Sequence, residues 1–338
     1  MPYPIVGEYC RFSGGDKPTL LVVIDTEEEF EWGSAFSRGN TSVQAMRYVH
    51  RIQSVFDEYK ITPVYVIDYP VASQKNGYAP LIEISGDGRC IIGAHLHPWV
   101  NPPFAETLSR TNSFPGNLPR QLESEKLKML SDAIAERFGS RPTVYKAGRY
   151  GVGPHTAAIL EEQGFEIDMS VCPYMNYSIE GGPDFTDMSA WPYWFGRRPL
   201  LELPLTVGFT GAFRIGGAKF YDAATTSLMR RLHAPGILAR LGLFNKVWLS
   251  PEGYLFSETT HLVRTLIADQ LRVFSFAFHS PSLACGNTPY VRSQRDLDDF
   301  LAHCRRFFDF FFGELGGVSS TPAAVRNDLI AREATRAA

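Results

Sequence analysis

The stretch TLLVVID, residues Thr19–Asp25, places five apolar residues in succession and ends in a carboxylate. A short continuous apolar run predicts a strand that is buried on both faces, as in a parallel sheet. Six further runs follow along the chain: Thr62–Asp68, Cys90–His95, Thr143–Ala147, Ile167–Val171, Leu200–Leu205 and Val273–His279. Seven strands favour a barrel over an open sheet, although the pattern by itself also allows a doubly wound fold.

Segments between and after these runs carry apolar residues three or four positions apart, which is the spacing of an amphipathic helix. The clearest are Met46–Phe56, Leu127–Phe138, Pro154–Gln163 and Leu297–Phe308. Alternation of strand and helix predicts an α/β protein with a parallel sheet. We expect one barrel domain with insertions over residues 1–317, followed by a polar, alanine-rich tail or surface helix at 318–338.

The charge balance argues against a nucleic-acid partner, since 33 basic and 36 acidic residues give a net charge of -3. The first residues lack the basic and apolar segments of a secretory signal, and no apolar stretch is long enough to span a bilayer. Five scattered cysteines without a CxxC pair indicate reduced thiols. We therefore expect a cytoplasmic protein.

One apolar segment, Ile237–Leu249, is interrupted by Arg240 and Lys246. It is suited to lying on a membrane surface, where it would bring a lipid-linked glycan to a site. Packing against the barrel or contact between subunits of a homodimer is the interpretation we favour.

Polar side chains gather at the ends of the predicted strands. Asp25 and Glu27 end the first, His95 and His97 end the third, and Asp168 and His279 belong to the fifth and the last. Because a parallel barrel brings the carboxyl ends of all its strands to one mouth, these groups should meet there.

Residues two apart on a strand point to the same face. Asp25 and Glu27 therefore form one side-by-side pair, and His95 and His97 form another. A carboxylate with two imidazoles is a sound ligand set for Zn²⁺ or another divalent metal. The acidic residues Glu28, Glu29 and Glu31 are expected to be solvated. Glu202 is expected either to face the cleft, to support the residues that line it, or to lie on the surface.

Five fragments in this order resemble the motifs of the polysaccharide deacetylases with the NodB homology domain, carbohydrate esterase family four. The fragments are VIDTE (Val23–Glu27), GAHLHPW (Gly93–Trp99), KAGRYG (Lys146–Gly151), DMSVCP (Asp168–Pro173) and FAFHSP (Phe276–Pro281). The resemblance spans most of the chain and implies a distorted seven-stranded (β/α) barrel.

The resemblance also implies roles for individual residues. Asp25 corresponds to the general base, and His279 to the general acid that protonates the leaving amine. His95, with His97 and Glu27, corresponds to the ligands of a divalent metal, with zinc expected first and Ni, Co or Mn as alternatives. The remaining pair, Arg149 and Asp168, correspond to residues that orient the base and the acid.

The chain departs from the family pattern at three points. The second carboxylate of the first motif is displaced to Glu27, with Thr26 in its usual place. The two histidines are two residues apart instead of four, and Trp99 takes the fourth place. Either Lys146 or Arg149 can fill the cationic position of the third motif.

The expected function is removal of an acetyl group from an N-acetylated or O-acetylated sugar of a surface-polysaccharide or lipopolysaccharide precursor. Trp99 and Tyr150 are candidates to stack on the sugar ring. Two alternatives stay open: hydrolysis of a cyclic amide or a glycosidic bond on the same barrel, or a non-catalytic glycan-binding relative. A glycosidase would need two carboxylates across the cleft, for which Asp25 and Asp168 are the obvious pair.

Overall fold

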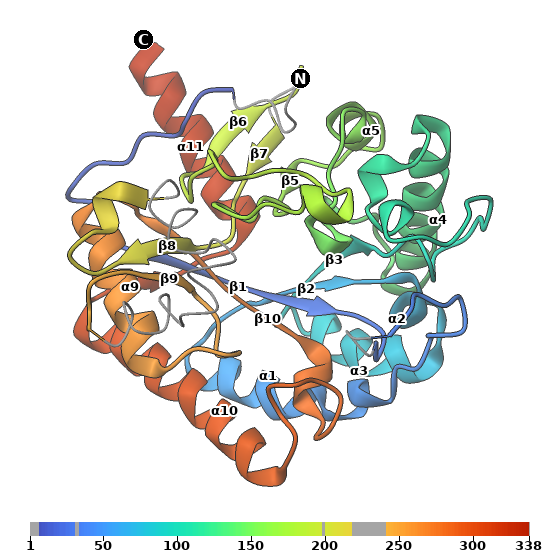
Figure 1. The fold of residues 1–338 in the computed structure, drawn as a ribbon, viewed down its shortest axis with the longest axis horizontal. Helices are drawn as coiled ribbons and strands as arrows, with labels where there is room; N and C mark the ends of the chain where they lie inside the picture. Colours follow the sequence, from blue (N-terminus) through green and yellow to red (C-terminus); the bar gives the residue numbers. More distant parts are fainter. Residues whose placement is uncertain (1–6, 31–33, 198–199, 218–240, 338) are drawn as a thin grey trace.

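The computed structural model describes residues 7–30, 34–197, 200–217 and 241–337. Seven parallel strands form one curled sheet in the order β10-β1-β2-β3-β4-β5-β7 (Figure 1). The strands are β1 (Thr19–Thr26), β2 (Val64–Ile67), β3 (Ile91–Leu96), β4 (Val144–Ala147), β5 (Ile167–Asp168), β7 (Leu200–Glu202) and β10 (Val273–His279). Each of the seven predicted runs overlaps one of them, so the predicted distorted (β/α) barrel is confirmed.

The sheet is not closed by strand pairing between β7 and β10. The chain after β7 bridges this gap, since Ser275 donates through N to Thr206 Oγ1 at 2.8 Å and through Oγ to the Pro204 carbonyl at 3.1 Å. β6 (Tyr193–Phe195) adds an antiparallel strand beside β7. The result is a curled half-barrel in place of a regular barrel.

An antiparallel hairpin of β8 (Val207–Thr210) and β9 (Asn245–Trp248) lies next to the gap. Leu249, which follows β9, accepts a hydrogen bond from the Ala277 N–H of β10 at 3.1 Å. The sequence of segment 237–249 suits either membrane-surface contact or, as the favoured interpretation, packing or subunit contact. Its residues 237–240 lie outside the described part, and its β9 portion packs into the fold through strand pairing.

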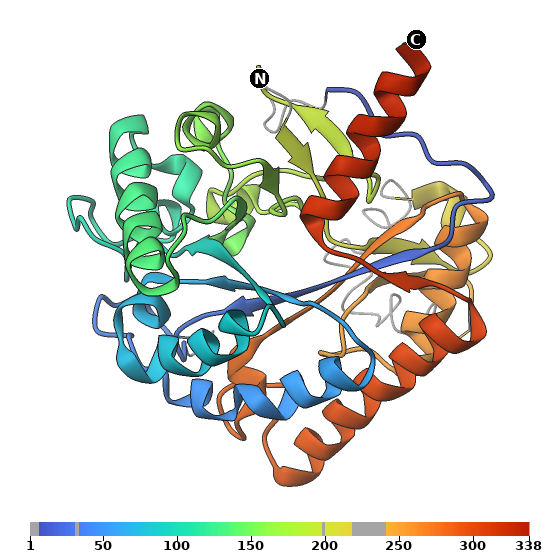
Figure 2. The same ribbon diagram turned by 180° about the vertical axis from the view of Figure 1, so that it is seen from behind.

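Helices cover the outer face of the sheet (Figures 1 and 2). They are α1 (Val49–Glu58), α2 (Tyr69–Ser73), α3 (Lys75–Gly86), α4 (Arg120–Phe138), α5 (Thr156–Glu162), α9 (Phe256–Ala268) and α10 (Gln294–Phe308), whereas α11 (Pro322–Ala337) packs against the inner side. Local sequence sets their ends: Ser293 Oγ caps α10 by accepting from the Asp296 N–H, and Gly139 ends α4 at a φ of +78°. None of the described helices is long and apolar enough to cross a membrane.

The period of two in β1 divides the core into two layers. Leu20, Val22 and Ile24 pack against the helices, whereas Leu21 and Val23 belong to a second cluster inside the barrel. The same alternation assigns Asp25, the next odd-numbered residue, to the inner face. The fold thus points a carboxylate into the barrel at the carboxyl end of its central strand.

The segment 318–338 is expected to be a tail or surface helix, and its described residues, 318–337, are tied to the barrel. β11 (Val318–Ser319) pairs in parallel with β1, and α11 follows it (Figure 2). Val325 and Leu329 stand four residues apart on α11, so they share a face that is buried in the inner cluster. The C-terminal helix is therefore part of the packed domain.

We predict that Leu329→Ala lowers the free energy of unfolding by about 2–3 kcal/mol, because the side chain is 2% exposed and truncation leaves a cavity. The adjacent Ile330 is 39% exposed and is the matched control, for which Ile330→Ala should change stability by less than about 1 kcal/mol. Urea denaturation measures both. Equal effects of the two substitutions would contradict the packing of α11.

Candidate active site

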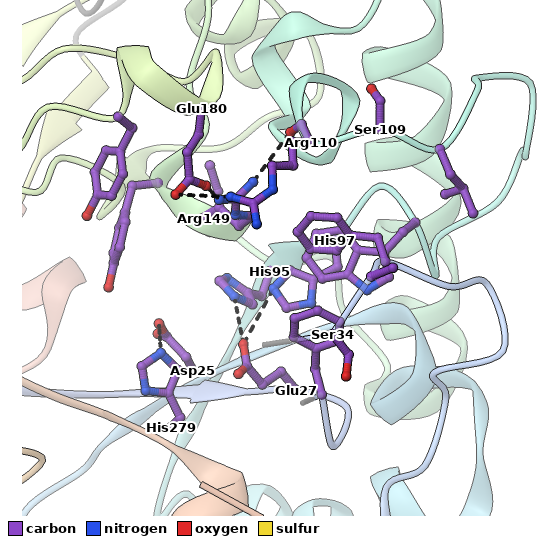
Figure 3. Close-up of a pocket in the computed structure, with 18 residues that line it drawn as sticks. Asp25, Glu27, Ser34, His95, His97, Ser109, Arg110, Arg149, Glu180 and His279 are labelled. Carbon is purple, nitrogen blue, oxygen red and sulfur yellow. Dashed lines mark hydrogen bonds and ion pairs between the residues drawn. The ribbon is translucent and has the colours of Figure 1, made fainter. Parts of the chain in front are cut away.

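Five of the six acidic and histidine residues predicted to meet at the strand ends do so at one mouth of the barrel. Asp25, Glu27, His95, His97 and His279 line a cavity of about 560 Å³ (Figure 3). Strand register explains the meeting, because β1 lies between β10 and β2, and β3 follows β2. Asp25 on β1 is directly opposite His279 on β10.

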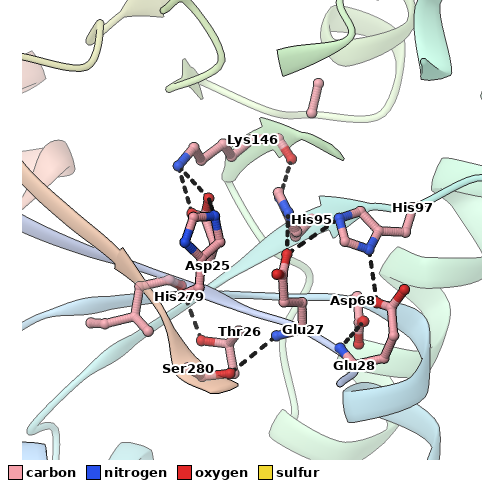
Figure 4. A network of polar contacts seen from close by, with 12 residues as sticks. Asp25, Thr26, Glu27, Glu28, Asp68, His95, His97, Lys146, His279 and Ser280 are labelled. Atoms are coloured by element: carbon pink, nitrogen blue, oxygen red, sulfur yellow. Dashed lines mark hydrogen bonds and ion pairs between the residues drawn. The ribbon is translucent and has the colours of Figure 1, made fainter. Parts of the chain in front are cut away.

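The predicted metal ligands form a compact buried group (Figure 4). Glu27 Oε2 lies 3.5 Å from His95 Nε2 and 3.4 Å from His97 Nε2. The other ring nitrogens are engaged, since His95 Nδ1 donates to the Lys146 carbonyl at 2.9 Å and His97 Nδ1 to Glu28 Oε2 at 2.8 Å. The Nε2 atoms are therefore the ring nitrogens of both histidines that face the Glu27 carboxylate. This donor set fits a divalent cation, and the outer contacts are those that orient ligand histidines.

Glu28 does not belong to a solvated acidic run, so that expectation is wrong for this residue. Its carboxylate is fully buried and accepts hydrogen bonds from His97 and from Trp99 Nε1, the latter at 2.7 Å. Its backbone N–H donates to Asp68 Oδ2 at 2.7 Å. Burial raises the pKa of Glu28 to about 7. Burial and the neighbouring Glu28 carboxyl raise the pKa of Asp68 well above its usual range. Of the other two acids, Glu29 accepts from Ser42, and Glu31 lies outside the described residues.

Asp25 is held by a lysine. Lys146 Nζ donates to both carboxylate oxygens, at 2.5 and 2.7 Å, and both side chains are buried. Burial alone would raise the pKa of Asp25, but Lys146, with His95 and His279, outweighs it and lowers the pKa to about 2. Of the two cations in the third motif, Lys146 is the one that contacts Asp25.

His279 is held from behind by Glu252, a residue that the sequence analysis missed. His279 Nδ1 donates to Glu252 Oε2 at 2.8 Å, and its Nε2 lies 3.7 Å from Asp25 Oδ2. Burial alone would lower the pKa of His279, but Glu252, followed by Glu27, outweighs it and raises the pKa to about 9. Glu252 follows β9 in an irregular segment, where no sequence period indicates its direction.

Arg149 and Asp168 do not contact the base or the acid through any hydrogen bond or ion pair of the described residues. Arg149 lines the cavity, where it pairs with Glu180 and donates to Ser113 Oγ. Asp168 lies outside the cavity lining and accepts from Ser170, next to the buried Glu202. Burial raises the pKa of Asp168 to about 7 and that of Glu202 well above its usual range.

The two aromatic residues predicted to stack on sugar, Trp99 and Tyr150, differ in their surroundings. Trp99 is only 2% exposed and lies between the rings of His97, at 4.3 Å, and Phe36, at 4.7 Å. Tyr150 lines the cavity and stacks on Tyr177 at 5.6 Å. Tyr150 also borders a second cavity of about 140 Å³, which shares Asp25 and His279 with the first.

We predict strong coupling between Asp25 and Lys146. Lys146→Met and Asp25→Asn should each destabilise the fold by about 3–5 kcal/mol. Each substitution removes one charge of the buried pair and leaves the other without its partner. The double variant should lose much less than the sum of the two losses, as measured by urea denaturation. Additive losses would contradict the pairing.

A scan against protein-family models and a search of curated proteins gave no match to this chain. Solved structures do match it. A protein from Mycobacterium smegmatis described as a polysaccharide deacetylase has a TM-score of 0.54 and 15% identity, covering 97% of this chain and 96% of that one. A second such protein, from Pseudomonas aeruginosa PAO1, has a TM-score of 0.51 and 14% identity, with coverage of 96% and 93%.

The PuuE allantoinase is similar at a TM-score of 0.51 and 15% identity, covering 96% of both chains. The two deacetylase-like proteins and the allantoinase therefore share one architecture with this protein over almost its whole length. The chain has the distorted (β/α) barrel fold of the polysaccharide deacetylases.

Proposed function

We propose that the protein is a metal-dependent hydrolase that removes an acetyl group from an N-acetylated or O-acetylated sugar of a surface-polysaccharide or lipopolysaccharide precursor. One observation carries the proposal: a carboxylate held by Lys146 and an imidazole held by Glu252 face each other beside the Glu27–His95–His97 group. Their charge states suit opposite tasks, because Asp25 is an anion and His279 a cation at neutral pH.

Glu27, His95 and His97 would hold the cation, with zinc expected first and Ni, Co or Mn as alternatives. Burial lowers the pKa of His97, which keeps the imidazole neutral as a metal ligand requires. When bound, a divalent cation supplies Lewis-acid polarisation of the carbonyl and activation of water.

The chain's own residues would move the protons. Asp25 accepts a proton from the water that attacks the acetyl carbonyl, and Lys146 keeps this carboxylate oriented. The Nε2–H of His279 then protonates the nitrogen or oxygen that leaves with the sugar, so the C–N or C–O bond breaks and acetate forms. Glu252 stabilises the imidazolium before this transfer.

Glycosidic hydrolysis is less well supported than acyl hydrolysis. A glycosidase needs two carboxylates that face the same cavity. Asp25 lines the cavity, but Asp168 does not and lies beside the buried Glu202. Cyclic-amide hydrolysis would use the same base, acid and metal ligands, and an allantoinase shares the fold. Allantoin therefore belongs in the substrate panel beside acetylated sugars.

We expect Asp25→Asn to abolish acetate release while the protein still binds zinc, because Asp25 lies outside the ligand group. His97→Gln should instead lose stoichiometric zinc together with activity, since it removes one of three ligands. Metal content by mass spectrometry and acetate release from acetylated sugars measure the two effects. Activity retained in Asp25→Asn would exclude Asp25 as the base, and a wild-type protein that binds no metal would favour a non-catalytic role.

The pH dependence of turnover tests the acid. His279 donates only while protonated, so activity should fall as the pH rises through about 9. Glu252 is the main group that raises this pKa, and Glu252→Gln should therefore move the alkaline limb to lower pH. A kcat profile of the zinc-loaded protein measures the shift. An unchanged alkaline limb in this variant would contradict the assignment of His279.

A further inference from the structure

Two arginines and one glutamate form a charged cluster on the cavity wall opposite Asp25 and His279 (Figure 3). Arg149 pairs with Glu180 Oε2, and Arg110 Nη1 lies 3.6 Å from Glu180 Oε1. The three residues therefore hold two guanidinium groups around a single carboxylate. None of the three contacts Asp25, Lys146 or His279 by a hydrogen bond or ion pair in the described residues.

The backbone at Arg149 is in an unusual conformation. Arg149 and Tyr150 have φ values of +53° and +59°, a region that residues other than glycine adopt rarely and mostly where it serves a site. The turn is fixed from the preceding side, since a Cβ on Gly148 would lie 2.3 Å from the His97 ring. This geometry directs the Arg149 side chain into the cavity.

A continuous row of rings joins this cluster to the proposed metal site. His97 stacks on Trp99 at 4.3 Å, Trp99 packs on Phe36 at 4.7 Å, and Arg149 Cζ lies 5.1 Å from the Phe36 ring. Phe114 covers the guanidinium at 4.1 Å. Arg149 is thus held by ring contacts in the same cavity as the proposed reacting groups, on the wall opposite Asp25 and His279.

The cluster carries an excess of positive charge that is accessible to a ligand. The Arg110 side chain is 74% exposed, so its guanidinium keeps donors available beyond its single contact with Glu180. Glu180 ends a short 3₁₀ turn, Ser178–Glu180, and is itself 38% exposed. Its carboxylate occupies the position that the oxyanion of a ligand would take between two planar guanidinium groups.

We propose that Arg110 and Arg149 form an oxyanion subsite, and that the substrate is an acetylated sugar bearing a carboxylate or phosphate group, which replaces Glu180 there. The statement that the bound sugar is acetylated and loses its acetyl group rests on the proposed function. The oxyanion subsite itself rests on the geometry of the cluster alone.

The test compares binding of three probes by calorimetry: N-acetylglucosamine, N-acetylglucosamine 1-phosphate and N-acetylmuramic acid. One acidic probe or both should bind about ten- to hundredfold more tightly than the neutral sugar, the effect of a charge-assisted contact. The relative affinity of the two acidic probes distinguishes phosphate from carboxylate. Absence of any preference in the wild-type protein overturns the proposal.

Two variants should change this preference in opposite directions. Arg110→Gln should remove most of it, and Arg110 is chosen because its side chain is 74% exposed, so the substitution should leave the fold intact. Glu180→Gln should strengthen binding of the preferred acidic sugar severalfold, because the internal competitor is lost. Arg295→Gln, at a 91% exposed side chain on α10, is the control and should leave all affinities unchanged.

A cluster that merely holds the loops together would give a different result. Both variants would then weaken binding of all three sugars alike, and this outcome overturns the subsite. Turnover of the zinc-loaded protein separates the two proposals. Arg110-dependent binding of an acidic sugar without acetate release would refute the hydrolase and retain the subsite, whereas acetate release without any acidic preference would do the reverse.

Discussion

The site depends on one buried ion pair, between Asp25 and Lys146. A carboxylate inside a barrel loses its hydration, so it stays ionised only when a cation inside the barrel compensates it. β4, which carries Lys146, is separated from β1 by β2 and β3, and the two side chains meet because the sheet curls. The curvature of the fold and the charge state of the proposed base are therefore two aspects of the same constraint.

Buried partners also determine which nitrogen of each histidine faces the cavity. His95 is oriented by the Lys146 carbonyl, His97 by Glu28 and His279 by Glu252. Lys146 acts twice, since its ammonium group holds Asp25 and its carbonyl accepts from His95. Movement of β4 would consequently disturb the proposed base and the proposed metal ligands together.

The period of two along the strands explains which parts of the site the sequence could predict. Asp25, His95 and His279 were predicted to converge because each ends a strand, and the structure brings them together. The same alternation distinguishes Lys146 from Asp168. Lys146 lies two positions after the inward-facing Val144 and therefore also points inward. Asp168 lies between the inward-facing Ile167 and Met169 and therefore points outward. Sequence reasoning that used strand ends alone assigned Asp168 to the mouth.

Groups beyond the strands could not be predicted in this way. Arg149 follows β4 in a turn with positive φ, and Glu252 follows β9 in an irregular segment. Glu28 is the second residue after β1, where alternation no longer applies, and its partners are distant in sequence. Strand β9 and helix α11 are held by tertiary contacts that no local pattern indicates.

The three departures from the family motifs compensate one another in the structure. Thr26, in the place of the usual second carboxylate, shares the parity of Ile24 and is buried with its hydroxyl bonded to the Ile24 carbonyl. Glu27 continues the inward alternation of Asp25 with a longer side chain, and both imidazoles of the His-x-His pair at the end of β3 lie next to its carboxylate. Lys146, and not Arg149, contacts Asp25, the proposed base, and Arg149 lies on the far wall of the cavity with Glu180. The altered motifs therefore describe a rearranged site in which the residues proposed as acid, base and metal ligands line one cavity.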